Sequence, residues 1–78
     1  MAKHLKNIST ALFRKYLEHK GLKHIRTSSG HEIWCRSDLK RPVAFQTHIN
    51  PIPEFIIKNN LRIIGVDRDD FLDFLENG

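Results

Sequence analysis

Cysteine is nearly absent from this sequence of 78 residues, because Cys35 is the only one and no intramolecular disulfide can form. Long apolar runs are absent too. No segment of about 18 residues is apolar enough to span a bilayer, and the polar start, Met1–Asn7, lacks an apolar signal core. These absences predict a cytoplasmic protein with no membrane partner and no cleaved leader.

The chain is too short for more than one hydrophobic core, so residues 1–78 are interpreted as a single domain. Hydrophobic residues make up 40% of it and charged residues 28%, as in ordinary globular proteins. A domain of this size buries only about 60–65% of the surface of its unfolded chain, which argues against a large enclosed substrate cavity. We expect any chemistry on an open surface that suits an extended or polymeric ligand.

Acidic residues are scarce in the first half of the chain. Residues 1–41 contain ten Lys and Arg against three acidic residues, whereas residues 42–78 contain three against six, and the whole chain carries +4. A basic half with aromatic residues among its charges is typical of nucleic-acid-binding proteins. Charge alone does not decide this, because charged residues also keep small domains in solution.

The spacing of apolar residues predicts three helices. The first spans residues 10–20 and ends at Gly21, which suits a left-handed position after the last turn. The second spans residues 53–64 and carries one apolar stripe. The third is short and acidic, with its aspartates facing solvent, and it follows Asp67, whose side chain can cap it. We expect its buried face to consist of Phe71, Leu72, Phe74 and Leu75.

Three strands are expected between the first two helices, since β-branched residues and turn signals replace the helical spacing there. They cover residues 22–27, 32–36 and 43–49, with a tight turn at 28–30 and a polar loop at 37–42. In the third strand one face consists of Val43, Phe45, Thr47 and Ile49. The result is an α+β domain in the order α-β-β-β-α-α, with helices on one face of a three-stranded antiparallel sheet.

Motifs for several kinds of chemistry are missing from the sequence. Its five histidines provide no pair at the i, i+4 spacing within one helix that zinc sites use, and there is no cysteine pair or phosphate-binding glycine loop. Ser28 and Ser29 lie near His31, but no third orienting acid with a recognisable signature follows them. We therefore expect no metal and no cofactor.

The clearest motif lies in the segment Ser28–Trp34. A Gly/Ser turn leads directly to His31, and an Ile-aromatic pair follows. His48 precedes two prolines that lead into the second helix, and an acidic Phe-Leu-x-Phe-Leu sequence closes the chain. In their order and spacing, these features resemble the HicA family of toxins from bacterial and archaeal toxin–antitoxin systems, over roughly residues 9–75.

The resemblance implies a fold similar to the double-stranded RNA-binding domain, cleavage of mRNA without a metal, and a HicB-like antitoxin as the protein partner. His31 falls at the position of the family's catalytic histidine, and His48 matches another histidine often seen before the second helix. Two features differ from the family's turn motif. Ser29-Gly30 reverses its Gly-Ser order, and Glu32 stands where a second histidine is usual.

A histidine at this turn also has a chemical rationale. RNA cleavage without a metal uses the adjacent 2′-hydroxyl as nucleophile, so the protein must remove one proton and supply another, and an imidazole can do either near neutral pH. The second proton carrier is left open among His48, Glu32, and water or the phosphate itself. Phosphates are expected to be bound by five cations: Lys23, Arg26, Arg36, Lys40 and Arg41.

Two alternatives stand beside a ribonuclease. One is an RNA-binding module of the same fold that does not cleave, which Glu32 in place of the second histidine supports. The other is a protein-interaction domain without RNA affinity. Trp34 is expected to pack rather than stack on a base, and Cys35 to be a small buried residue. The remaining histidines are expected at the surface: His4, His19 and His24.

Overall fold

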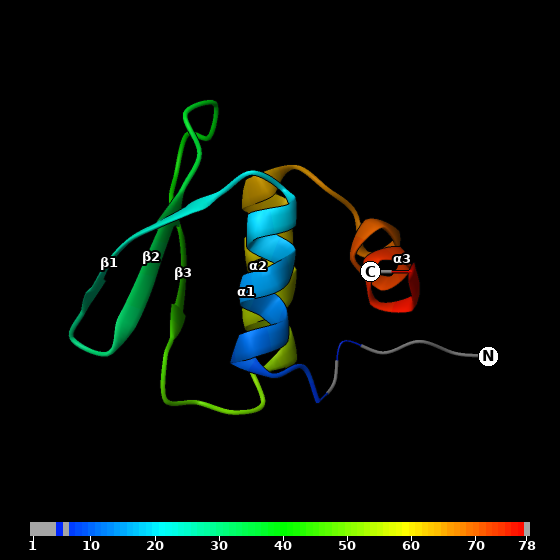
Figure 1. The fold of residues 1–78 in the computed structure, drawn as a ribbon, viewed down its shortest axis with the longest axis horizontal. Helices are drawn as coiled ribbons and strands as arrows, with labels where there is room; N and C mark the ends of the chain where they lie inside the picture. The colour runs from blue at the N-terminus through cyan, green and yellow to red at the C-terminus, as the bar shows by residue number, and fades with distance from the viewer. Residues whose placement is uncertain (1–4, 6, 78) are drawn as a thin grey trace.

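The computed structural model describes residue 5 and residues 7–77, which form three helices and a three-stranded antiparallel sheet (Figure 1). In chain order the elements are α1 (Thr10–His19), β1 (Lys23–Ser28), β2 (His31–Cys35), β3 (Val43–Gln46), α2 (Glu54–Ile64) and α3 (Arg68–Asn77). This confirms the α+β class and the predicted order. The prediction for His4 falls outside the described residues. No helix in the described part of the chain is both long and apolar enough to cross a membrane.

Helix boundaries follow from local capping. Helix α1 begins after Ser9, the N-cap, whose hydroxyl oxygen accepts a hydrogen bond from the Leu12 amide at 3.0 Å. It ends at His19, with Lys20 as its C-cap, and Gly21 follows with φ of +85°. Helix α3 is capped as predicted, because the Asp67 carboxylate accepts a hydrogen bond from the Asp70 amide at 2.9 Å.

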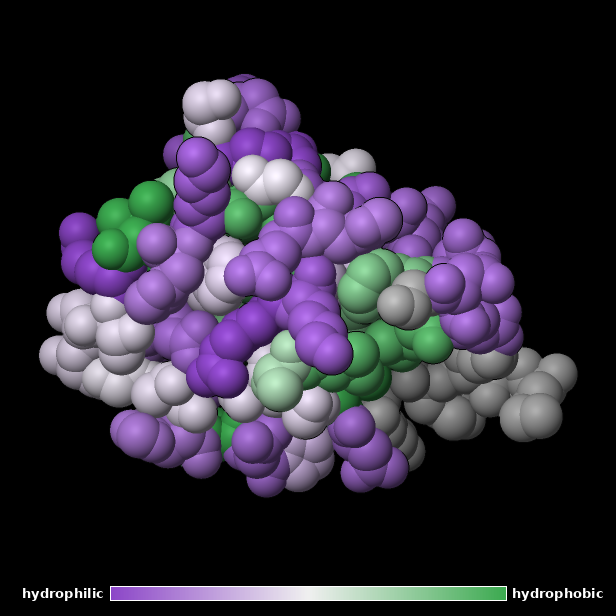
Figure 2. Space-filling view, in the orientation of Figure 1, coloured by the Kyte–Doolittle hydropathy of each residue, from purple (hydrophilic) through white to green (hydrophobic). Residues whose placement is uncertain are grey.

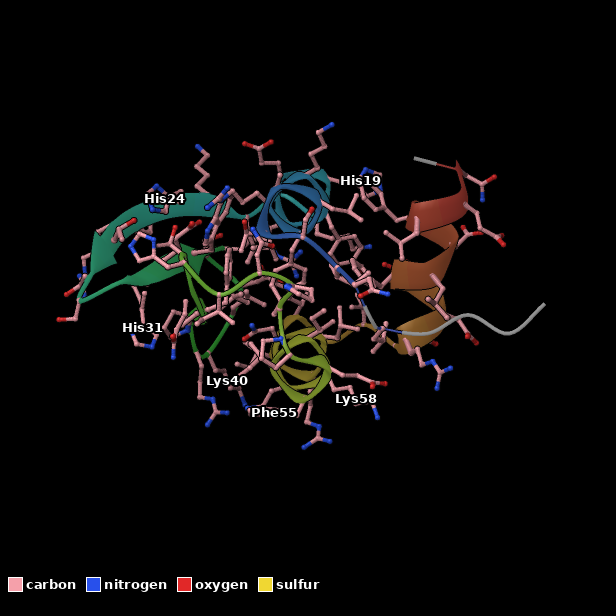
Figure 3. The ribbon with its side chains drawn as sticks, turned by 90° about the horizontal axis from the view of Figure 1, so that it is seen from below. His19, His24, His31, Lys40, Phe55 and Lys58 are labelled. Carbon is pink, nitrogen blue, oxygen red and sulfur yellow. The ribbon has the colours of Figure 1, made fainter. Side chains whose placement is uncertain are left out.

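The sheet has the strand order β1-β2-β3, and its two outer strands differ in how they are protected. Strand β1 contains a bulge between His24 and Arg26. Strand β3 lies against α2, where the Asn60 side chain donates a hydrogen bond to the Ala44 carbonyl at 3.0 Å. Helices α1 and α2 lie beside the sheet, and α3 lies on their far side (Figures 1 and 3).

An aromatic cluster joins the three layers. Phe13 of α1 meets Phe45 of β3 edge to face, with ring centroids 5.3 Å apart, and Tyr16 of α1 meets Phe71 of α3 at 4.7 Å. All four side chains are buried. Helix α1 is therefore the central element of the core, between the sheet and α3. Hydrophilic side chains cover most of the surface on the α1 side, and hydrophobic ones gather where α1 approaches α3 (Figure 2).

The predicted third strand and the predicted buried face of the third helix are each wrong in part. The third strand ends at Gln46 instead of continuing to residue 49, because its partner β2 begins at His31, directly opposite Gln46, and the Ile49 amide turns back to the Gln46 carbonyl at 3.5 Å. Ile49 consequently does not join the inner face and is 42% exposed. In α3 only Phe71 is fully buried, whereas the other three apolar residues predicted for its buried face are half-buried.

The aspartates of α3 are also not all directed to solvent. Asp70 accepts a hydrogen bond from the Tyr16 hydroxyl at 2.6 Å and forms an ion pair with Lys20 at 3.1 Å. The Tyr16 hydroxyl and then the Lys20 ammonium hold the pKa of Asp70 below its usual value. Asp70 therefore helps to attach α3 to α1.

Candidate functional site

Strand β2 separates consecutive side chains onto two faces of the sheet, as strand geometry requires. Glu32 and Trp34 point toward the helices and are 5% and 4% exposed. We call this the covered face. His31 lies on the opposite, open face, together with Ile33 and Cys35, and it is exposed. The buried position of Trp34 confirms that it packs, whereas Cys35 is only half-buried, in contrast to its predicted burial.

A two-residue turn fixes the backbone that carries His31. Ser29 and Gly30 have φ of +52° and +79°, and Ser28 pairs directly with His31 across the turn. Positive φ at both positions is typical of the tight turns that suit twisted antiparallel strands. The Gly30 carbonyl also accepts the hydrogen bond from the Thr47 amide. The turn is therefore attached to the segment after β3, and His31 follows directly from this attached turn.

The hydrogen bond of the His31 ring determines which nitrogen is available. Its Nδ1 lies 3.2 Å from the Ser29 carbonyl oxygen. A carbonyl can only accept, so Nδ1 carries the hydrogen, and in the neutral ring Nε2 is then the unprotonated nitrogen. The exposed imidazole can therefore accept a proton at Nε2.

A shallow hollow of about 260 Å³ lies beside this ring. It is formed where the start of β2, the segment after β3 and the beginning of α2 meet, and its lining consists of His31, Gln46, Ile49, Pro53, Phe55 and Ile56. We call it the His31 hollow. Gln46 is the direct cross-strand partner of His31, so their side chains lie next to each other on the open face. Phe55 is 70% exposed.

Phe55 and Gln46 were not predicted as functional residues. The apolar stripe of α2 contains Ile57, Leu61 and Ile64, and all three are buried as expected. Phe55 lies off this stripe, and an aromatic residue outside the core stripe of a helix was the available signal. Gln46 gave no signal, because its position opposite His31 depends on the pairing of β2 with β3.

The five predicted phosphate-binding cations do not form one cluster. Arg26 pairs with Ile33, so it lies on the open face and is the diagonal neighbour of His31, within reach of long side chains. Lys23 lies farther along β1, opposite Cys35. Lys40 and Arg41 lie in the loop between β2 and β3, at the other end of β2 from His31. Only Arg26 of these four is next to the histidine.

Arg36, the fifth cation, is held by neighbours within the protein. Its guanidinium donates to both oxygens of Asp38, at 2.5 and 3.1 Å, and to the Lys20 carbonyl at 2.6 Å. The Asp38 carboxylate raises the pKa of Arg36. A side chain with these contacts connects the end of α1 to the loop after β2 and is the least available of the five for a ligand.

A larger hollow of about 460 Å³ lies at the other end of the sheet, between the loop after β2 and α2. Lys40, Arg41 and Arg62 contribute to its lining, with Asp38 and Asn59. It is basic, and its lining contains no histidine or cysteine. Lys40 and Lys58 point to the same side of the molecule as His31 and Phe55, and His19 and His24 lie on the other side (Figure 3).

Glu32 is part of a hydrogen-bonded network on the covered face. Its carboxylate accepts from the Arg14 guanidinium, with Nε 3.0 Å from each oxygen and a further short contact to Nη2. The Thr47 hydroxyl donates at 2.6 Å and the Trp34 indole N–H at 3.1 Å. Thr47 in turn accepts from Arg14 at 3.1 Å. The network joins α1, β2 and the segment after β3.

This network determines the ionisation of Glu32, which was one of the options for the second proton carrier. The hydrogen bond from Arg14 is the main cause that lowers the pKa of Glu32 from 4.5 to about 2, with help from Thr47 and Trp34, while burial opposes the shift. Glu32 is therefore ionised at neutral pH, and it faces away from His31. An ionised carboxylate has no proton to donate, and the Glu32 side chain lies on the covered face, opposite to the face that carries His31.

The other histidines lie apart from the His31 hollow. His48 is exposed in the turn after β3 and does not contribute to the lining. His24 bonds to Thr27 at 3.0 Å and lies near Trp34, and His19 lies against Phe74. Both are exposed, as predicted. Within residues 5 and 7–77, no three side chains of His, Cys, Asp or Glu are grouped as metal ligands would be.

Comparisons of this chain with family models, with curated proteins and with solved structures gave no match. The candidate site is therefore defined by its geometry: an exposed imidazole with one free nitrogen, an adjacent arginine, and a hollow with an exposed aromatic ring.

Proposed function

We propose that this protein is a HicA-like endoribonuclease that cleaves mRNA without a metal, using His31 as its general base. The order and spacing of residues 28–34 suggested this activity, and the free Nε2 of the exposed His31 ring is the observation that supports it most. An open hollow suits a polymeric substrate that passes over the surface. A HicB-like antitoxin remains the proposed protein partner.

The proposed reaction needs one base at the ribose. Nε2 of His31 takes the proton of the 2′-hydroxyl, and the 2′-oxygen forms a bond to phosphorus as the bond from phosphorus to the 5′-oxygen breaks. Water supplies the proton to the leaving 5′-oxygen. The products are a 2′,3′-cyclic phosphate and a 5′-hydroxyl. Arg26, the diagonal neighbour of His31, is placed to stabilise the negative charge that develops on the phosphate oxygens.

Cleavage of unstructured RNA in EDTA tests this proposal. The His31→Ala variant is expected to cleave about 10²–10⁴-fold more slowly than the wild type, because it lacks the positioned base. His24→Ala is the matched control, since His24 is also an exposed histidine of the same sheet but contacts Trp34 on the covered face. Equal cleavage by wild type and His31→Ala, or none by either, would refute the proposal.

One observation favours a second candidate, an RNA-binding module that does not cleave. The lining of the His31 hollow contains no acid or base besides His31 itself. A module of this kind would bind RNA in a salt-dependent way, and His31→Ala would leave both the affinity and the absence of products unchanged. Measuring binding and cleavage on the same oligonucleotide separates the two candidates.

A further inference from the structure

We propose that the His31 hollow binds a single unstacked base of single-stranded RNA, with the Phe55 ring stacked on the base and the Gln46 amide bonded to its edge. The inference deepens the proposed function, on which it rests for placing RNA at His31, and it names the substrate class of the same site. It is tested by binding alone, so it can fail while the cleavage proposal stands.

Folding does not explain the position of Phe55. The side chains of α2 that enter the core are Ile57, Asn60, Leu61 and Ile64. Phe55 is 70% exposed, more than Ile25 at 55% and Ile49 at 42%. An exposed aromatic ring at the rim of a hollow offers a flat apolar surface, and aromatic rings bind unstacked bases of any sequence in this way.

The hollow has the size and polarity for part of a polymer. At about 260 Å³ it is smaller than the roughly 300–1,000 Å³ of pockets that enclose a drug-sized ligand. Ile49, Pro53 and Ile56 make one side apolar, and Gln46 and His31 make the other polar. A base has apolar faces and polar edges, so it matches both sides.

Gln46 is placed to contact the edge of such a base. It pairs directly with His31 across β2 and β3, and its exposed side chain lines the hollow. A carboxamide both donates and accepts, which matches the hydrogen-bonding edge of a base. In duplex RNA the bases are stacked and their pairing edges are occupied, so this arrangement favours a single strand.

The charges around the hollow favour RNA over an apolar protein segment. Arg26 of β1 lies on the open face, diagonal to His31, which lines the hollow. Lys58 is exposed on α2, three residues after Phe55 and so on the same side of the helix. Its ion pair with Glu54 is long, at 3.8 Å, and exposed, so it competes weakly with a phosphate. The acidic helix α3 lies on the far side of α1 and α2 from the sheet (Figure 1). A strand that passes over the hollow therefore has one cation on the β1 side of His31 and another on α2.

The test is a titration of the full chain with a short single-stranded RNA that carries 2-aminopurine, a base whose fluorescence falls when it stacks. A 2′-O-methyl group on each ribose removes the nucleophilic hydroxyl and prevents cleavage. Wild type is expected to quench the fluorescence, and Phe55→Ala to bind about 5- to 150-fold more weakly. Phe55→Leu keeps an apolar side chain but should lose the quench, and Gln46→Leu should bind more weakly while keeping it.

Matched controls come from the protein and from the nucleic acid. Ile25→Ala removes another exposed apolar side chain, outside the hollow, and should bind like the wild type. A strand with an abasic site in place of the 2-aminopurine, and the same strand in a duplex, should bind about as weakly as Phe55→Ala binds the intact strand. Circular dichroism of each variant confirms that the fold is intact.

Three outcomes overturn the inference: Phe55→Leu with the quench of the wild type, abasic RNA bound as tightly as intact RNA, or duplex bound as tightly as single strand. If RNA is nevertheless cleaved in a His31-dependent way, the proposed function stands without the base-binding hollow. If the quench depends on Phe55 but no cleavage occurs, the hollow is supported and the proposed function fails.

Discussion

The two faces of the sheet differ most at two consecutive residues, His31 and Glu32. His31 is exposed and makes one hydrogen bond, to a carbonyl two residues earlier. Glu32 is 5% exposed and accepts hydrogen bonds from Arg14, Thr47 and Trp34, which lie up to 18 positions away in the chain. Because side chains alternate along a strand, His31 is exposed to solvent and Glu32 is buried against the helices. Substitution of His31 should therefore change activity, and substitution of Glu32 should change stability.

The largest effect is expected for His31→Ala. Cleavage should fall about 10²–10⁴-fold, whereas the free energy of unfolding should stay within about 0.5 kcal/mol of the wild type, because the side chain is exposed. Cleavage rates and urea unfolding of the same preparation measure both quantities. A loss of stability above about 1 kcal/mol would mean that the open face contributes to folding more than this comparison assumes.

Glu32→Ala should have the opposite profile. It leaves the buried Trp34 N–H without its acceptor and removes the partner of Arg14, so we expect the free energy of unfolding to fall by about 2–4 kcal/mol. The melting temperature should drop by roughly 10–25 °C. Glu18→Ala, which removes an exposed acid of α1, is the control and should change stability by less than about 0.5 kcal/mol. Thermal unfolding of both variants measures this difference. Equal melting temperatures for Glu32→Ala and Glu18→Ala would contradict the prediction.

Acid should weaken the hydrogen-bonded network around Glu32 on the covered face. Glu32 has a pKa of about 2 in the folded protein against 4.5 as its ordinary value, so its contribution is present above about pH 4.5 and is lost as the pH falls toward 2. The contribution amounts to at most about 3 kcal/mol. Asp70, whose pKa is also lowered, loses its contribution in the acid range as well.

The Glu32→Gln variant separates these two carboxylates. Urea unfolding between about pH 7 and pH 2.5 should give a smaller decline of stability for the variant than for the wild type, because only Asp70 and weaker groups still titrate. Parallel curves for the two proteins would show that Glu32 is not held in its ionised form by Arg14.

The smallest effects are expected for Arg26 and Arg36, which were predicted together from the sequence as phosphate-binding cations. Arg26→Ala should lower the slope of log affinity for single-stranded RNA against log salt by about 0.7, with unchanged stability. Arg36→Ala should leave that slope nearly unchanged and lower stability by about 1 kcal/mol or less, since Arg36 bonds to Asp38 and the Lys20 carbonyl. Binding titrations at several salt concentrations measure the difference, and a reversed pattern would move the RNA path toward the loop after β2.

Much of the fold follows from the sequence, because apolar spacing reports directly which side of an element is buried. The order of elements, the stripe of α2 and the inward positions of Val43 and Phe45 were all predictable in this way. The end of β3 was not. The alternation in the sequence continues through Thr47 and Ile49, but the partner strand β2 begins at His31, opposite Gln46. Thr47 therefore bonds only to the turn residue Gly30, and the residues after it have no strand to pair with.

The site was predictable only at its centre. The turn before His31 and the exposure of His31 were both predictable from neighbouring residues in the sequence. Glu32 could not be assigned to the covered face, because its main partner, Arg14, lies 18 positions earlier in another element. The separation of Arg26 from Lys40 and Arg41 likewise depends on strand pairing, which brings distant residues together or keeps them apart.

Both edge strands of the sheet are poorly suited to pairing with a fourth strand. On one side the Asn60 amide occupies the Ala44 carbonyl, and on the other the bulge in β1 breaks the regular spacing of backbone groups, next to the charged Lys23 and Arg26. Edges of this kind resist pairing between copies of a chain. The open face of the sheet can therefore be exposed to a ligand while its edges disfavour pairing with a second copy of the chain.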